Sequence, residues 1–154
     1  MSGAFLKLLK NLRNSFLWIW EQKGSPAQRA RGIAVGVFSG CFPLFGFQSF
    51  IGLGLASLFK ANHLLALTGT WISNPLTYIP LYWFNYKVGA FCLDQDPKLL
   101  QLKDFSQTDI WKHGWFISSR ILLGSSIVGL FASMVTGLIF YMVFRASLKK
   151  DNFI

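Results

Sequence analysis

Acidic residues are scarce in this chain, and its long uncharged stretches contain none. Six Asp and Glu residues stand against 15 Lys and Arg residues, and the uncharged stretches cover residues 32–59, 61–86 and 121–144. A proton relay or metal site built on a buried carboxylate is therefore not expected there. The two histidines, His63 and His113, stand alone, and no Cys or His spacing resembles that of a metal site. We expect neither a metal ion nor a cofactor.

Sequence motifs of common catalytic sites are also missing. The glycines do not have the spacing of a phosphate-binding loop, and no Gly-x-Ser-x-Gly elbow occurs. The sequence indicates no catalytic residues. We interpret the chain as a protein that is not an enzyme.

The composition is that of a membrane protein. Hydrophobic residues make up 53% of the chain and charged residues 14%, which is outside the usual range of soluble proteins. About 20 apolar residues cross a bilayer core of about 30 Å, so residues 121–144 can form one span. The first two stretches are too long for one straight crossing and, if divided at Pro43 and Asn74-Pro75, too short for two.

Each of these two stretches can form a kinked span, a tilted hairpin or a re-entrant pair of half-helices. We expect three short segments of unequal depth before the polar region at residues 94–114. The sequence thus predicts an all-α fold, a polytopic integral membrane bundle with broken helices.

The positive charge is concentrated at the two ends of the chain. A net charge of +9 could suggest nucleic acid, but six Lys and Arg residues precede the first uncharged stretch and three closely follow the last. Residues 94–114 hold three lysines and four aspartates and are the better candidate for the far side. By the positive-inside rule, both termini are expected to be cytoplasmic. We expect a lipid bilayer as a partner and no nucleic acid.

Residues 1–24 are predicted to form a basic amphipathic helix. Apolar residues recur there at helical spacing on one face, and polar and charged residues lie on the other. Such a helix is expected to lie in the headgroup region, where its lysines attract anionic lipid. The alternative is a helix that packs on the protein's own domain.

The next boundaries follow from helix punctuation. Ser25, Pro26 and Gln28 have the pattern of a capping box, so a helix is expected to begin there. The membrane helical domain is predicted over residues 25–148, and a basic tail over residues 149–154. Within the domain we expect a broken helix pair at residues 25–60, a second at 62–93, a polar loop at 94–114 and a long transmembrane helix at 115–148.

Small residues recur at four-residue spacing in two of the predicted helices. One set is Gly32, Gly36 and Gly40, and the other is Ser125, Gly129, Ser133 and Gly137. This spacing places each set on one helix face, where another backbone can approach closely. We expect both faces to pack on neighbouring helices, on each other, or in a homo-oligomer or complex with another membrane protein.

Polar side chains gather at the two breaks. Ser39, Gln48 and Ser49 flank Pro43, and Thr70, Ser73, Asn74 and Thr77 flank Pro75. They can supply the hydrogen bonds that an interrupted backbone loses in hydrocarbon. One interpretation is that they cap broken ends; the other is that Gln48, Asn74 and Thr77 line a binding site between paired half-helices.

Arg120 is a cationic residue directly before the last predicted span. The simpler interpretation is a headgroup anchor, in a region that also holds Trp111 and Trp115. The alternative is that Arg120 points inward and binds an anionic lipid headgroup or an aspartate of the polar loop.

Several segments resemble a bacterial membrane family, domain of unknown function 2062. They are Gly36-Val37-Phe38-Ser39-Gly40, Pro43-Leu44-Phe45-Gly46-Phe47-Gln48, Asn62, Ala66 and Thr70-Trp71-Ile72-Ser73-Asn74-Pro75-Leu76-Thr77. The resemblance covers about residues 26–141. It implies an integral membrane domain of the bacterial envelope and no known reaction. We expect the protein in the inner (cytoplasmic) membrane or a related internal membrane. The positions that match its motifs are Pro43, Gly46, Gln48, Asn74, Pro75 and Thr77.

Two classes of function remain. The first is a noncatalytic component that assembles with another envelope component. The second is a small-solute or lipid translocating protein that uses re-entrant half-helices. A polar interior cavity joining Gln48, Asn74 and Thr77 would favour translocation, whereas a dry core with a large exposed apolar or glycine face would favour assembly. We favour assembly.

Overall fold

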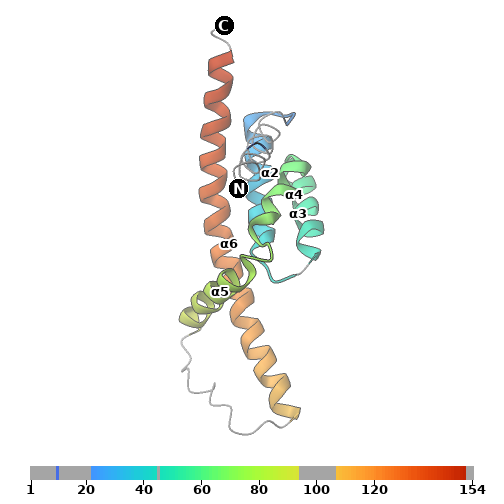
Figure 1. The fold of residues 1–154 in the computed structure, drawn as a ribbon, viewed down its shortest axis with the longest axis vertical. Coiled ribbons are helices and arrows are strands. Elements are labelled where there is room, and N and C mark those ends of the chain that lie inside the picture. The colour runs from blue at the N-terminus through green and yellow to red at the C-terminus, as the bar shows by residue number, and fades with distance from the viewer. Residues whose placement is uncertain (1–9, 11–21, 45, 94–106, 152–154) are drawn as a thin grey trace, which may run out of the picture.

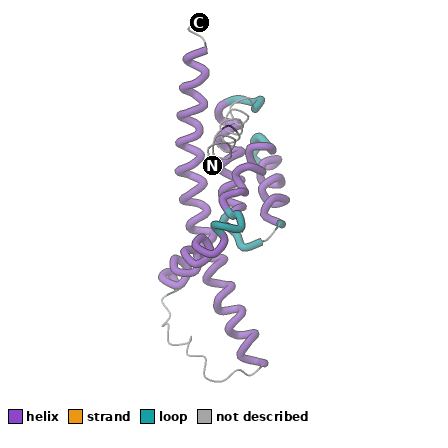
Figure 2. Tube along the Cα trace, in the orientation of Figure 1, coloured by secondary structure: helices purple, strands orange, loops and turns teal. Residues whose placement is uncertain are grey.

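The computed structural model describes residue 10 and residues 22–44, 46–93 and 107–151. Apart from residue 10, these residues form five α-helices and one short 3-10 helix, without a strand (Figure 2). In chain order the elements are α2 (Pro26–Gly40), α3 (Phe47–Leu58), α4 (His63–Gly69), the 3-10 helix η1 (Thr70–Ile72), α5 (Tyr78–Cys92) and α6 (Gln107–Asp151). The all-helical prediction is confirmed for this part of the chain. Most of the amphipathic helix expected at residues 1–24 lies outside the described residues.

The first helix begins where the sequence predicted. The Ser25 hydroxyl accepts a hydrogen bond from the Gln28 amide at 3.2 Å, and the Gln28 side chain accepts one from the Ser25 amide at 3.0 Å. Pro26 occupies the first helical turn, where its missing N–H costs nothing. The predicted capping box is therefore present.

Both predicted interruptions occur as well. The chain leaves the helical path between Gly40 and Phe47, around Pro43, and again between Ile72 and Tyr78, around Pro75. At 1.5 Å per residue, α2 and α3 are about 22 and 18 Å long, which is less than the roughly 30 Å of a bilayer core. Neither is long enough to cross a membrane alone.

One helix segment in the described part of the chain, Gly114–Ser147, is long and apolar enough to cross a bilayer. It belongs to α6, which runs the length of the molecule in Figure 1. The polytopic character of the bundle stays a prediction. Helix α6 begins at Gln107, so residues 107–114 are helical rather than part of the polar loop predicted at 94–114. No proline interrupts these eight residues, and Gly114 alone does not stop a helix.

Helix α2 lies between α6 and the layer formed by α3 and α4 (Figure 1). Its glycine face meets α4: a β-carbon on Gly36 would collide with the Ala66 carbonyl oxygen, and one on Gly69 would lie 2.7 Å from the Ile33 carbonyl oxygen. The backbones of α2 and α4 are therefore in direct contact. This contact is possible because both helices present glycine at the crossing.

The small residues of α6 meet the opposite side of α2. A β-carbon on Gly129 would lie 3.2 Å from the Phe38 ring, and one on Gly137 would lie 3.1 Å from the Ala34 β-carbon. The two small-residue faces thus do not pack on each other. A further close crossing joins α5 to α6, where β-carbons on Gly89 and Gly124 would collide with the carbonyl oxygens of Arg120 and Asn85.

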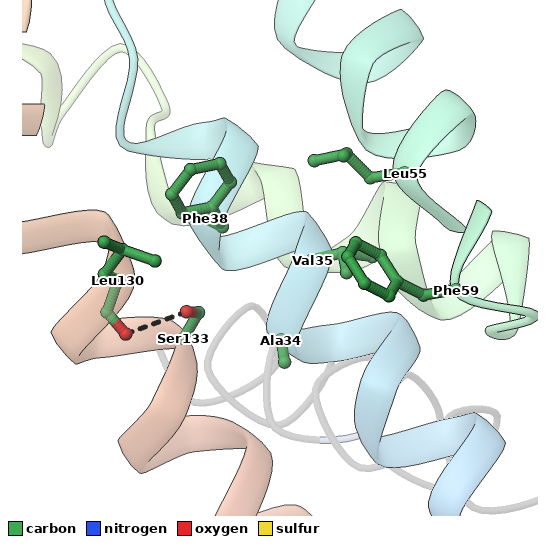
Figure 3. Close-up of a pocket in the computed structure, with 7 residues that line it drawn as sticks. All are labelled: Ala34, Val35, Phe38, Leu55, Phe59, Leu130 and Ser133. Atoms are coloured by element: carbon green, nitrogen blue, oxygen red, sulfur yellow. Dashed lines mark hydrogen bonds between the residues drawn. The ribbon is translucent and has the colours of Figure 1, made fainter. Parts of the chain in front are cut away.

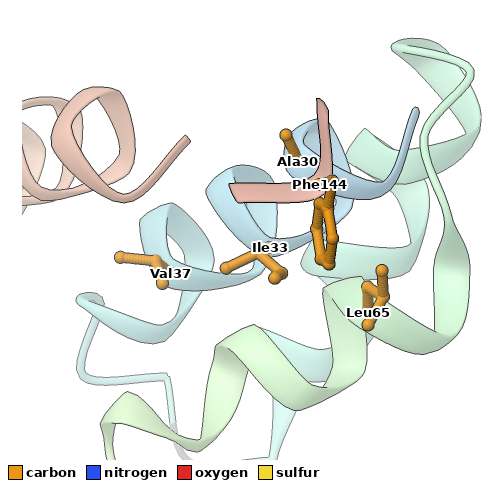
Figure 4. Packing of buried hydrophobic residues seen from close by; sticks show 5 residues of the cluster. All are labelled: Ala30, Ile33, Val37, Leu65 and Phe144. Carbon is orange, nitrogen blue, oxygen red and sulfur yellow. The ribbon is translucent and has the colours of Figure 1, made fainter. Parts of the chain in front are cut away.

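A small apolar cluster closes the end of the molecule where α2 begins. Phe144 of α6 is completely buried and packs with Leu65 of α4 and with residues of α2; Figure 4 shows the cluster, Ala30, Ile33, Val37, Leu65 and Phe144. The Arg29 guanidinium lies 4.0 Å from the centre of the Phe144 ring. Many of the largest apolar side chains lie outside this core, on the outer faces of α3 and α6. Such a surface is expected for a protein surrounded by lipid.

Candidate polar site at the helix breaks

The interrupted end of α2 is covered by side chains of α5. Asn85, which is 0% exposed, donates from Nδ2 to the Cys41 carbonyl oxygen and to the Ser125 hydroxyl, both at 2.9 Å. One turn earlier, the Tyr82 hydroxyl donates to the Phe42 carbonyl oxygen at 3.2 Å. The last carbonyls of a helix have no partner within it, and Pro43 removes a further donor. Helix α5 therefore supplies hydrogen bonds that the break leaves missing.

Three buried hydroxyls near the breaks donate hydrogen bonds to backbone carbonyls three residues earlier in the chain. Ser39 donates to the Gly36 carbonyl oxygen at 3.0 Å, Thr70 to that of Leu67 at 2.7 Å, and Ser73 to that of Thr70 at 3.3 Å. Helix α3 closes over two of them, because Gly52 faces both Ser39 and Thr70. These hydroxyls are used in local backbone bonds.

Asn74 and Thr77 lie together, but they bond to each other and to the second break. The Asn74 side-chain oxygen accepts from the amides of Leu76 at 2.9 Å and Thr77 at 3.2 Å. The Thr77 hydroxyl accepts from the Asn74 amide at 2.9 Å and donates to the Ile72 carbonyl oxygen at 2.7 Å. The interpretation that these residues cap a broken end fits this geometry better than a ligand-binding role.

Gln48, in the first turn of α3, is 6% exposed. It precedes Gly52 by one turn, so it lies on the helix face that meets α2 and η1. Its Oε1 and the Oδ1 of Asn85 are buried side-chain acceptors that have no hydrogen-bond partner among the described residues. A buried acceptor without a partner costs about 1–3 kcal/mol. These two oxygens are the chemically unusual feature of the region.

Arg120 lies on the inner side of α6 and is 3% exposed. Its Nη1 donates to the Phe116 carbonyl oxygen at 2.9 Å, and its guanidinium lies 3.1 Å from the centre of the Phe116 ring. Its own backbone carbonyl faces Gly89 of α5. A headgroup anchor would keep the guanidinium in water, so the anchor interpretation does not fit this burial. Arg120 also lies away from Gln48, Asn74 and Thr77 in chain order and on another element.

The Asn74 and Thr77 side chains thus bond within the Trp71–Thr77 turn, and this turn is one of the segments whose sequence resembles a known family. Over residues 9–152 the chain matches the family described as "Uncharacterized protein conserved in bacteria (DUF2062)". The chain belongs to this family. The resemblance inferred from the sequence motifs is confirmed. No curated protein and no solved structure matches the chain.

Asn85, a completely buried polar residue of this DUF2062 chain, was missed by the sequence interpretation. The signal was present, because Asn85 is the only amide side chain in the apolar helix α5, and a buried amide needs hydrogen-bond partners. Its partners could not be identified, since Cys41 and Ser125 lie 44 and 40 residues away in the chain. Ser125 was assigned only to a packing face.

Two hollows in the described part of this DUF2062 chain lie elsewhere. One of about 320 Å³ lies between α2, α3 and α6 (Figure 3), and one of about 170 Å³ adjoins it between α2 and α6. Their walls do not include Gln48, Asn74, Thr77 or Arg120. Among the described residues, no group of three His, Cys, Asp or Glu side chains could hold a metal ion.

Proposed function

We propose that this DUF2062 chain is a noncatalytic integral membrane component of the bacterial envelope that assembles with another membrane protein or with a second copy of itself. Its place is the inner membrane or a related internal membrane, with both termini on the cytoplasmic side. The observation that carries the proposal is a contrast. The polar groups at Asn74 and Thr77 are used up in capping, whereas the large uncovered surfaces are apolar helix faces.

Helix α6 provides the clearest of these faces. Ile127, Phe131, Met134, Leu138 and Met142 recur at intervals of three or four residues and are all exposed. They form a stripe about 22 Å long at 1.5 Å per residue. Most of the candidate span is uncovered by the rest of the described chain. A spanning helix with one covered side can receive a second helix on the other side.

The distribution of cations supports the orientation. Lys23, Arg29 and Arg31 lie at or just before the start of α2, and the Arg31 Nη2 reaches the Lys60 carbonyl oxygen at 3.5 Å. Arg145 follows Phe144, which contacts Arg29. These five cations therefore gather at one end of the molecule. The positive-inside rule assigns such an end to the cytoplasm.

Extraction in a mild detergent followed by mass measurement tests the assembly. We expect the wild-type protein to be recovered as an oligomer or with a partner. Phe131→Ala combined with Met134→Ala, at side chains that are 72% and 67% exposed, is expected to reduce that recovery at least about fivefold, because large anchors dominate binding. Phe50→Ala, on the exposed face of α3, is the matched control. A monomer without any partner in wild-type samples would contradict the proposal.

The two unpartnered amide oxygens favour a second candidate, translocation of a small solute or lipid past the helix breaks. They are the only observation at the breaks that points to a ligand among the described residues. In proteins with broken helices, interrupted segments can bind a polar substrate at mid-depth. Under this candidate, the Gln48 Oε1 and the Asn85 Oδ1 would accept hydrogen bonds from that substrate.

Gln48→Met separates the two candidates. If Gln48 has no ligand, the substitution removes a buried unpaired acceptor and is expected to leave the free energy of unfolding unchanged or to raise it by about 1 kcal/mol. Thermal unfolding in detergent measures this change, with Ser49→Ala as the control at the neighbouring position. Solute uptake into proteoliposomes that Gln48→Met or Asn74→Ala abolishes, in variants that remain folded, would replace assembly by translocation.

A further inference from the structure

The two hollows lie next to each other along α2, and together they are called the groove. The larger is lined by Ala34, Phe38, Leu55, Phe59 and Leu130, among others, and the smaller begins at Ala27; both share Ala34. From Ala27 to Phe38 the groove extends about 16 Å at 1.5 Å per residue. Figure 3 shows Leu130 and Ser133 of α6 on one side of α2, and Leu55 of α3 with Phe59, which directly follows α3, on the other.

The walls of the groove are apolar over most of this length. Alanine, valine, leucine and phenylalanine side chains line the larger hollow, and Ser133 adds one hydroxyl, which donates to the Leu130 carbonyl oxygen of its own helix at 2.9 Å. A hollow of this kind has few groups that could orient a polar solute. It suits a flexible hydrocarbon chain.

One end of the groove is polar and positive. Arg31 and Tyr141 line the smaller hollow, and both side chains are exposed. Lys60 lies beside Arg31, and Arg145 follows Tyr141 by one turn of α6. Neither hollow is lined by an Asp or Glu side chain. The charge complementarity favours an anionic occupant.

We propose that the groove binds one anionic phospholipid, with an acyl chain along α2 between α3 and α6 and the phosphate at Arg31 and Tyr141. Guanidinium groups form short, charge-assisted hydrogen bonds with phosphate oxygens, and the phenol adds a donor. The site rests on the membrane location in the proposed function, but not on assembly with a partner. It differs from the general attraction of basic residues to anionic lipid because it joins a headgroup contact to a defined apolar groove.

Native mass spectrometry of the full-length protein with phosphatidylglycerol or phosphatidylcholine tests the headgroup contact. We expect one phosphatidylglycerol to remain bound in preference to phosphatidylcholine, and Arg31→Gln to reduce that preference about fivefold, the effect of one cation near a membrane. Lys87→Gln, which removes a cation that stacks on Trp83 of α5, should leave the preference unchanged. Equal retention of both lipids by the wild-type protein would overturn the proposal, even if the protein is still recovered with a partner.

Photochemical labelling tests the groove itself. Phosphatidylglycerol with a photoreactive group in its acyl chain is expected to label peptides containing Phe38 and Phe59. Ser133→Phe, which fills the groove from α6, should abolish that labelling, whereas Ser126→Phe, two turns earlier on the same helix, should not. If Ser133→Phe fails to fold, Leu55→Trp fills the groove from α3.

Other occupants give different results in the same experiment. Labelling confined to the outer positions Phe50 and Phe131 would mean that lipid only surrounds the protein, and would overturn the site. An unlabelled groove in the wild-type protein would mean that residues 1–21 or a second copy closes it, with the same consequence. A variant that loses labelling but retains its partner separates this site from the assembly.

Discussion

Gly36→Ala is expected to lower the free energy of unfolding by about 3 kcal/mol and to disrupt the contact between α2 and α4. The added β-carbon would collide with the Ala66 carbonyl oxygen and would lie 2.8 Å from the Gly69 α-carbon. Both obstacles are backbone atoms, so no side-chain rotation can relieve the clash. Overpacking in a closely packed interior costs about 1–3 kcal/mol and occasionally more. Unfolding by heat or denaturing detergent, followed by circular dichroism, measures the change.

Gly54→Ala is the matched control on the neighbouring helix α3. A β-carbon on Gly54 would meet nothing within 4 Å, and alanine favours a helix over glycine by about 1 kcal/mol. This substitution is expected to be neutral or slightly stabilising. If Gly36→Ala behaved like Gly54→Ala, the close approach of α2 and α4 would be contradicted, and with it the helical layer that carries the groove.

The glycine spacing shows which part of the packing could be predicted from the sequence and which could not. Four-residue spacing fixes a helix face, so Gly32, Gly36 and Gly40 could be expected to meet a neighbouring element closely. The identity of that neighbour could not be derived, because α4 is only seven residues long and has no apolar periodicity of its own to indicate a face. The partner of a small-residue face is decided by the position of the breaks in three dimensions.

The breaks themselves were predictable, because Pro43 and Pro75 lack an N–H and cannot continue a helix. The use of the nearby polar residues was not. Asn74 and Thr77 could equally face a ligand or their own backbone, and the sequence does not distinguish the two, since both need the same donor and acceptor groups. Their side-chain hydrogen bonds stay within residues 71–77. Arg120 was difficult for a related reason: its burial depends on Gly89, which admits its backbone to α5.

Asn85→Leu is expected to lower the free energy of unfolding by about 2 kcal/mol. The Nδ2 bonds to the Cys41 carbonyl oxygen and to the Ser125 hydroxyl would both be lost. A buried carbonyl at the end of α2 would then lack this donor, which costs about 1–3 kcal/mol or more in a membrane interior. Removing the unpartnered Oδ1 offsets part of this loss. Leucine has a similar volume, so packing changes little and the measured difference reports mainly on hydrogen bonding.

Serine variants on α6 provide the comparison. Ser125→Ala removes one partner of Asn85 and is expected to cost about 1 kcal/mol, while Ser126→Ala removes only a bond to the Leu122 carbonyl oxygen of its own helix and should be close to neutral. The double variant Asn85→Leu with Ser125→Ala should be no less stable than Asn85→Leu alone, because the shared bond is already gone. Additive losses would mean that Asn85 and Ser125 stabilise the protein independently of their shared bond. An Asn85→Leu protein as stable as the wild type would mean that the glycine crossing of α5 and α6 holds the first break without help from the amide. An Asn85→Leu protein that folds normally but loses solute uptake would instead identify the unpartnered oxygen as part of a translocation path.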